Sequence, residues 1–114
     1  MAQVNETELL ERAEEVARKA DVYKDKIFAH EIFKHKSKAY LASLKWKNYG
    51  EGSDSARETA AMATEDWKNY IDKEMKTLEE AGRAKIEMEA AQVRYEAMRS
   101  ALSARKTEIK SFGG

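Results

Sequence analysis

The sequence contains no cysteine and no proline, and only five of its 114 residues are glycine. The lack of cysteine excludes disulfides, thiol nucleophiles and thiolate metal sites. Average usage would give about five or six prolines, so their absence removes the strongest interruption of helices. No run of 18 apolar residues occurs, so we expect no membrane span and place the protein in the cytoplasm. These absences favour long helices.

The charges balance, with 21 basic and 21 acidic residues. Overall attraction to nucleic acid or to an anionic membrane is therefore not predicted. Val, Ile, Leu and Phe make up only 18 of the 114 residues, so Ala, Met and aromatic residues must fill much of the interior. A core this thin predicts a slender helical bundle that associates with a further chain, and we expect a homo-oligomer.

The first predicted helix covers about residues 6–49. Asn5 followed by Glu8 has the chemistry of a helix N-cap. Apolar residues then recur at helical spacing: Leu9, Ala13, Val16, Ala20, Tyr23 and Ile27. The pattern then shifts by one position and resumes as Phe28, Ile32, His35, Ala39, Ala42, Trp46 and Tyr49, with Phe33, Leu41 and Leu44 widening the apolar face. We expect this second series to belong to the core.

A turn at residues 50–54 and a second helix over about residues 55–111 follow. Gly50 can adopt the left-handed conformation that ends helices, and Ser55 with Glu58 fits a capping box. On this helix an apolar stripe recurs in heptad-like steps, interrupted only by Arg105: Ala81, Ala84, Met88, Ala91, Tyr95, Met98, Leu102, Ile109 and Phe112. Gly82 leaves two alternatives open: one continuous helix, which we favour, or a break that makes three helices.

Charge is distributed in blocks along the chain. Residues 1–21, 22–49, 50–81 and 82–114 carry net charges of −3, +5, −5 and +3. A chain reversal near Gly50 would place blocks of opposite sign side by side, which favours one antiparallel register. The fold class we predict is all-α: an antiparallel, coiled-coil-like hairpin of two long helices, forming a single domain over residues 1–114. A dimer of such hairpins would form a four-helix bundle.

No motif in the sequence indicates catalysis. His30, Glu31 and His35 resemble a zinc-protease motif, in which the two His are at positions i and i+4. Here they are at i and i+5, which places the two rings about 140° apart around a helix. Gly-rich phosphate loops and nucleophile elbows are absent. We therefore expect no enzyme activity, metal, cofactor or small-molecule substrate.

The most distinctive segment combines basic and aromatic residues on the first helix. Its candidate binding residues are Lys24, Lys26, Lys34, Lys36, Lys38, Lys45, Lys47, Phe33 and Tyr40. Lysines between aromatic rings suit single-stranded nucleic acid, because Lys neutralises phosphates while rings such as Tyr40 or Phe33 stack on bases. The alternative is a solvated basic face that only pairs with the acidic helix.

Further residues are candidate anchors for a protein partner: Trp67, Tyr95, Met98, Ile109 and Phe112. Since the second helix is the longer one, we expect its last turns to project beyond the first helix. A row of mostly small residues, Ala90, Val93, Ala97, Ala101 and Ala104, would let another helix approach closely.

The chain resembles small coiled-coil accessory proteins of tailed bacteriophages. The likeness rests on the Lys- and aromatic-rich first helix, the Gly50-Glu51-Gly52 turn, the Ser55–Glu58 restart and the tail from Ala91 to Glu108. It implies a protein acting in the bacterial host cytoplasm that binds and inhibits a nucleic-acid-handling or defence complex, as anti-CRISPR-like inhibitors do. The alternative is a single-stranded nucleic-acid-binding accessory in phage recombination or replication.

Overall fold

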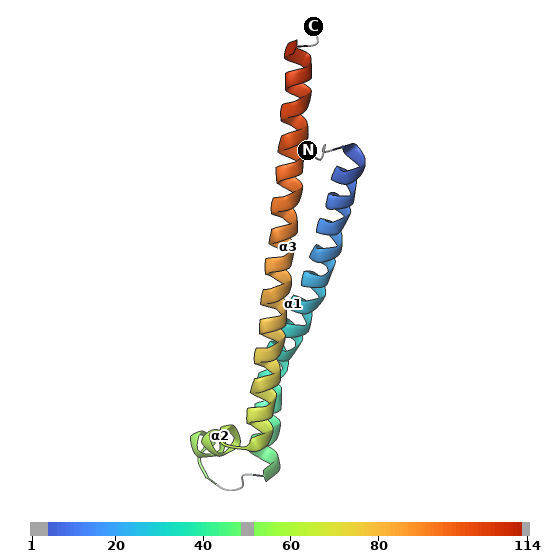
Figure 1. Cartoon of the computed structure of the whole chain (residues 1–114). Coiled ribbons are helices and arrows are strands. Elements are labelled where there is room, and N and C mark those ends of the chain that lie inside the picture. The colour runs from blue at the N-terminus through green and yellow to red at the C-terminus, as the bar shows by residue number, and fades with distance from the viewer. Residues whose placement is uncertain (1–4, 49–51, 113–114) are drawn as a thin grey trace. The chain divides into compact units, whose positions relative to one another are not determined.

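The computed structural model describes residues 5–48 and 52–112, except for the side chains of Asn48 and of residues 110–112. The chain order is α1 (Glu6–Asn48), α2 (Asp54–Met62) and α3 (Glu65–Phe112) (Figure 1). No strand occurs in these described ranges. The fold is all-α, as the composition predicted.

Each helix begins at a side-chain cap, which accounts for its start. The Asn5 Oδ1 accepts a hydrogen bond of 2.8 Å from the backbone of Glu8, as the sequence predicted for α1. The Ser53 hydroxyl accepts from the backbone of Ala56 at 3.1 Å and caps α2. Such caps satisfy N–H groups that have no partner within the helix.

The chain clusters into two compact units. Unit 1 comprises residues 1–24 and 82–114, and unit 2 comprises residues 25–81. Within unit 1, successive residues of α1 pair with α3 in reverse order: Glu6 with Lys106, Glu15 with Arg94 and Lys19 with Glu87. Within unit 2 the order is reversed in the same way: Lys26 with Glu80, His30 with Thr77 and Phe33 with Tyr70. The long helices therefore pack antiparallel within each unit, which confirms the predicted hairpin.

Small side chains line much of the packed face of α3. Ala84 and Ala91 are buried in unit 1, and Ala81 is buried in unit 2. In unit 1, Met88 and Tyr95 lie half-buried on the same face. Because alanine projects little beyond its backbone, it lets two helices approach closely. The heptad-like stripe predicted for this part of α3 is the packed face.

The second half of the chain is not one helix, as we had predicted, but two. α2 ends at Met62 and α3 begins at Glu65. Thr64 explains the interruption: its hydroxyl donates to the carbonyl of Ala61 at 2.6 Å and accepts from the backbone of Trp67 at 3.1 Å. It thereby caps a new helix.

Gly82 does not interrupt the helix, because α3 continues through it. A Cβ built at Gly82 would meet no atom within 4 Å, so no close contact requires glycine there. The alternative with three helices therefore placed the interruption at the wrong residue. The helix ends before Thr64, which caps α3, and not at Gly82. Gly50, where we placed the start of the turn, lies outside the described residues. Gly52 has a φ of 145°, a conformation that favours glycine.

Candidate functional site

The predicted basic residues of α1 are only partly used in ion pairs within unit 2. Lys26 lies 3.5 Å from Glu80, and Lys45 lies 2.8 Å from Asp54. The hydrogen bond from Lys45 lowers the pKa of Asp54 below its ordinary value. Lys24, Lys34, Lys36, Lys38 and Lys47 form no ion pair with any other described residue. Pairing with the acidic helix therefore accounts for two of the seven predicted lysines.

Two of the predicted base-stacking residues are already packed against other rings. Tyr40 stacks on Tyr70 with a centroid distance of 4.7 Å and on Trp67 at 6.4 Å. Phe33 lies 5.6 Å from Tyr70. We call these four rings the aromatic cluster. Their mutual contacts make Phe33 and Tyr40 part of the packing of unit 2.

Tyr70 ties the aromatic cluster to α1. Its hydroxyl donates a hydrogen bond of 2.5 Å to the backbone carbonyl of Phe33. Burial is the main cause that raises the pKa of Tyr70 above its ordinary value, and electrostatic repulsion from the nearby Glu74 and Tyr40 is the second. Both effects favour the protonated phenol in the folded state.

The packed face of α1 in unit 2 is partly polar. His30 is only 8% exposed, and its Nδ1 lies 3.1 Å from the Thr77 hydroxyl. That hydroxyl donates to the carbonyl of Glu74 at 2.7 Å, so it accepts a hydrogen bond from Nδ1 of His30. Ser37 is half-buried and Leu44 is 4% exposed on this same face.

The shifted apolar series lies on the other side of α1, so its assignment to the core was wrong. Phe28 is 66% exposed, Ile32 is 38% exposed and Trp46 is 76% exposed. Phe28 and His30 are two residues apart, which places them about 200° apart around a helix. Burial of His30 therefore turns Phe28 outward. We call this surface the outer stripe, and its described members are Phe28, Ile32, His35, Ala39, Ala42 and Trp46. Tyr49, the last member of the predicted series, lies outside the described residues.

The outer stripe carries one shallow depression and one contact with α2. The depression, of about 280 Å³, lies between Phe28, Ile32 and His35, beside Glu31 and Lys36. At the other end, the Arg57 guanidinium lies 4.8 Å from the centre of the Trp46 ring, which is a cation–π contact. The rest of the Trp46 side chain is open to solvent.

The predicted protein-docking anchors fall into two groups. Three anchors are half-buried. Trp67 belongs to the aromatic cluster, and Tyr95 and Met98 lie on the packed face of α3. Ile109 is 61% exposed and follows Lys106, which pairs with Glu6 at the start of α1. The C-terminal end of α3 extends past the first turn of α1 (Figure 1). The side chain of Phe112 lies outside the described residues. Of this set, Ile109 is the described residue with a largely exposed side chain.

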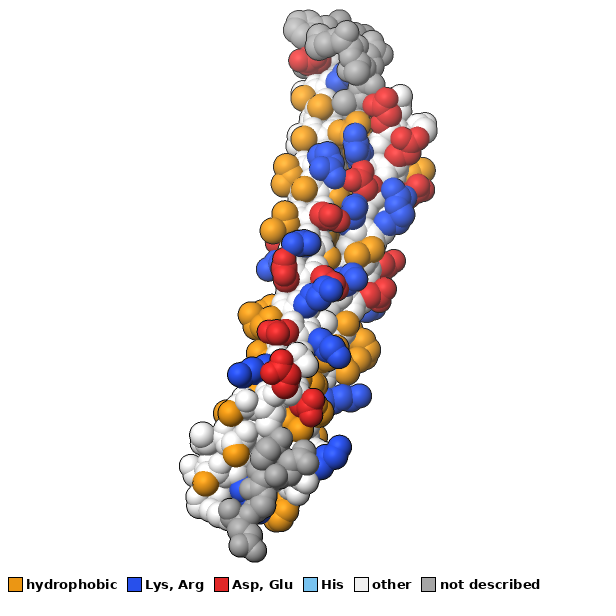
Figure 2. Space-filling model, turned by 60° about the horizontal axis from the view of Figure 1, so that its bottom comes forward, with side chains coloured by type: hydrophobic (Ala, Val, Ile, Leu, Met, Phe, Trp, Pro, Cys, Tyr) orange, Lys and Arg blue, Asp and Glu red, His pale blue; other side chains and the backbone are white. Residues whose placement is uncertain are grey.

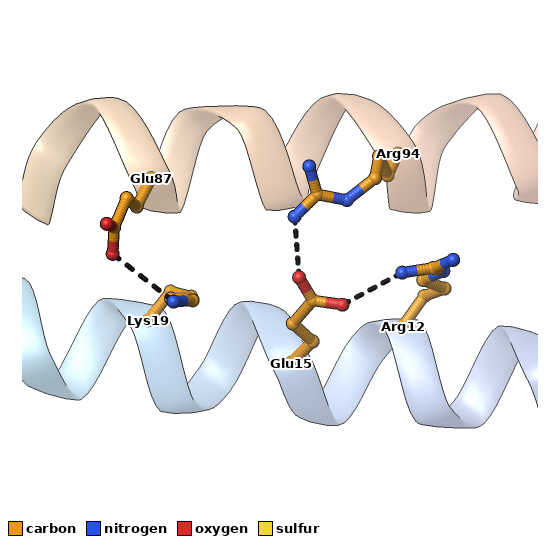
Figure 3. A network of polar contacts seen from close by, with 5 residues as sticks. All are labelled: Arg12, Glu15, Lys19, Glu87 and Arg94. Atoms are coloured by element: carbon orange, nitrogen blue, oxygen red, sulfur yellow. Dashed lines mark hydrogen bonds and ion pairs between the residues drawn. The ribbon is translucent and has the colours of Figure 1, made fainter.

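Unit 1 contains a network of charged side chains that joins α1 to α3 (Figure 3). Glu15 accepts from Arg94 at 2.6 Å and from Arg12 at 3.0 Å. These two hydrogen bonds, with that from Arg94 the stronger cause, lower the pKa of Glu15 below its ordinary value. Lys19 and Glu87 pair at 3.2 Å beside it. This surface differs from the outer stripe because its opposite charges satisfy one another.

Charges of both signs are interleaved over the face displayed in Figure 2, with hydrophobic side chains between them. No group of three or more His, Asp or Glu side chains in residues 5–48 and 52–112 is arranged to hold a metal ion. Within the same described residues, no helix has an apolar stretch long enough to cross a membrane. Comparison with protein-family models, curated proteins and solved structures gives no match for this chain.

Proposed function

We propose that the protein is a non-enzymatic interaction protein that binds its partner through the outer stripe of α1. Following the resemblance to phage accessory proteins, the partner would be a bacterial nucleic-acid-handling or defence complex that the protein inhibits. The observation that carries this proposal is the exposure of Phe28 and Trp46 on the side of α1 opposite the buried His30. Large exposed apolar side chains that line one side of an element are typical of interaction sites.

Plating efficiency in bacteria that carry a single defence complex tests the proposal. Expression of the protein is expected to restore plaque formation by a phage that the complex blocks. Phe28→Asp and Trp46→Asp are each expected to abolish this effect, because they place a charge in the interface. Leu10→Asp is the matched control, since Leu10 is 60% exposed on α1 but lies in unit 1. Inhibition that survives both outer-stripe substitutions contradicts the proposal.

Single-stranded nucleic acid is the second candidate ligand. It is favoured by Lys34, Lys36, Lys38 and Lys47, which have no ion-pair partner among the described residues. Lysines of this kind neutralise phosphates and make binding dependent on salt. Fluorescence anisotropy of a labelled oligonucleotide at low and near-physiological salt tests this candidate. Binding that weakens with salt and disappears on replacing Lys34, Lys36 and Lys38 by Ala supports it, and no binding at low salt eliminates it.

Self-association is a separate proposal that concerns α3 in unit 1. Ile86 and Val93 are each 68% exposed, and Ala90, Ala97, Ala101 and Ala104 are also exposed. Small residues in a row permit close helix packing. Sedimentation velocity should give a dimer for the wild type and a monomer for Val93→Glu. A wild-type monomer at high protein concentration rules out this interface.

A further inference from the structure

We propose that the outer stripe binds an acidic amphipathic helix of the partner protein. This inference rests on the proposed function and adds the chemistry of the segment that the partner presents. It is argued from the spacing of the apolar side chains, from their sizes and from the charges beside them.

The shape of the outer stripe suits a helix laid along α1. From Phe28 to Trp46 the stripe extends over five turns, or about 27 Å at 1.5 Å per residue. Its large side chains stand at the two ends, whereas Ala39 and Ala42 occupy the middle. Small residues at the centre allow a second helix to approach closely, and large residues at the ends fill the grooves between its turns. The depression between Phe28, Ile32 and His35 can receive one side chain of that helix.

The charges beside the outer stripe are mostly basic, which favours an acidic partner. Glu31 lies beside the Phe28 end of the stripe, in the lining of the depression, but no acidic residue occurs from Ile32 to Asn48. At 100° per residue, Lys36 and Lys47 lie on one side of the stripe, and Lys34 and Lys38 lie on the other. These four lysines have no ion-pair partner among the residues that the structure describes. A helix with Asp or Glu on both sides of an apolar seam would pair with them.

The same charges disfavour a second copy of the stripe as the occupant. Two outer stripes placed face to face would bring lysines against lysines, which is repulsive. Charged residues that flank an apolar seam pair with opposite charges on the partner helix, and this pairing selects one helical partner over another. The lysines therefore select against self-pairing while they select for an acidic helix.

The positions of the aromatic rings favour a helix over single-stranded nucleic acid. Binding by base stacking needs rings close enough to receive successive bases. Phe28 and Trp46 stand at opposite ends of the stripe, while Phe33 and Tyr40 are held in the aromatic cluster. Arg57 also lies over the Trp46 ring. Between the end residues the stripe presents Ile32, Ala39 and Ala42 with the single ring of His35, which suits a helix better than a row of stacked bases.

Binding of designed peptides to the full chain tests this inference. The probe is a labelled, side-chain-stapled helix of about 20 residues with Leu on one seam and Glu on both flanks. The control peptide has the same composition in a scrambled order. We expect the amphipathic peptide to bind at least about tenfold more tightly than the scrambled peptide in an anisotropy titration. Phe28→Asp or Trp46→Asp should each weaken its binding by about tenfold or more, whereas Leu10→Asp should not.

Reversal of charge provides the sharper test. The triple variant Lys36→Glu, Lys38→Glu, Lys47→Glu should lose affinity for the Glu-flanked peptide and gain affinity for a peptide with the same seam and Lys flanks. Circular dichroism of each variant establishes that it is folded, and the gain for the Lys-flanked peptide cannot arise from unfolding. Equal binding of the scrambled and amphipathic peptides overturns the inference. Tighter binding of an oligothymidine of about 20 nucleotides than of the acidic peptide overturns it in favour of nucleic acid.

The two proposals can fail separately. If the acidic peptide does not bind but Trp46→Asp abolishes inhibition of the defence complex in cells, the proposed function stands and the acidic-helix inference is wrong. If inhibition survives both Phe28→Asp and Trp46→Asp, the proposed function itself is wrong.

Discussion

Removal of the Tyr70 hydroxyl isolates the polar bond that joins the aromatic cluster to α1. Tyr70→Phe retains the ring, which lies 4.7 Å from Tyr40 and 5.7 Å from Trp67. It deletes the hydrogen bond to the Phe33 carbonyl. A net contribution of about 0.5–1.5 kcal/mol is typical for such a bond, so we expect the free energy of unfolding of unit 2 to fall by about 1 kcal/mol.

Urea titration followed by tryptophan fluorescence measures this loss in unit 2, because Trp46 and Trp67 both lie there. The pKa of Tyr70 is raised in the folded state, so the unfolded chain releases this proton at lower pH than the folded chain does. The stabilisation is therefore fully present below the ordinary tyrosine pKa of about 10. It is lost as the pH rises through the folded-state pKa.

The difference in stability between wild type and Tyr70→Phe should consequently stay constant between about pH 7 and pH 9 and shrink above about pH 10. Subtraction of the two profiles cancels the groups that do not interact with Tyr70, so the remaining pH dependence reports Tyr70 and its interactions with Glu74 and Tyr40. A variant as stable as the wild type at neutral pH would refute the structural role of the bond. A difference that persists unchanged into the alkaline range would refute the burial argument.

Three further substitutions test the helices. Gly82→Ala should raise the free energy of unfolding by about 0.5–1 kcal/mol, because Gly82 lies within α3 and a Cβ there meets no other atom. Urea titration followed by circular dichroism measures this change, and a lower stability of the variant would contradict the open space at Cβ. Thr64→Ala should lower the stability of unit 2 by about 1 kcal/mol by removing the cap on the Trp67 N–H, whereas the exposed Thr59→Ala should change it little. Glu15→Gln should lower the melting temperature at neutral pH, and the difference should close as the pH falls through the depressed pKa of Glu15; a difference independent of pH would argue against the pairing with Arg94.

The elements that the sequence predicted correctly depend on local chemistry. The Asn5 cap and the alternating apolar spacing up to Ile27 involve residues within a few turns of one another. The same holds for the heptad-like stripe of α3 from Ala81. The charge blocks predicted that the two long helices pack antiparallel, which agrees with ion pairs such as Glu15 with Arg94 and Lys26 with Glu80.

The separation of α2 from α3 was missed because its signal is weak. Thr64 is a good capping residue, but Trp67 stands where a capping box would have Glu or Gln. The Ser55–Glu58 pattern matches a capping box more closely, although the cap of α2 is Ser53. A cap defined by one hydroxyl and its backbone partners is visible only once the chain has folded.

The packed face of α1 beyond Ile27 was misassigned for a different reason. Ranking residues by hydrophobicity selects Phe28, Ile32 and Trp46 over His30 and Ser37. The actual choice depends on what α3 presents: Thr77 offers a hydroxyl to His30, and Tyr70 offers a ring to Phe33. These partners lie more than 35 positions away in the chain, so periodicity in α1 alone cannot reveal them.

The misassigned residues are the ones on which the proposed function depends. Burial of a large apolar side chain contributes about 1.5–3 kcal/mol, but only when it leaves water. In the free protein Phe28 and Trp46 remain largely in water, so they add little to folding, whereas Leu44 on the opposite face is 4% exposed and adds its full share. The apolar surface of α1 in unit 2 is thus divided between one face that stabilises the unit and an exposed face that, under the proposed function, a partner covers. Substitutions on the outer stripe should therefore separate binding from stability, which is the behaviour that distinguishes an interaction surface from a poorly packed core.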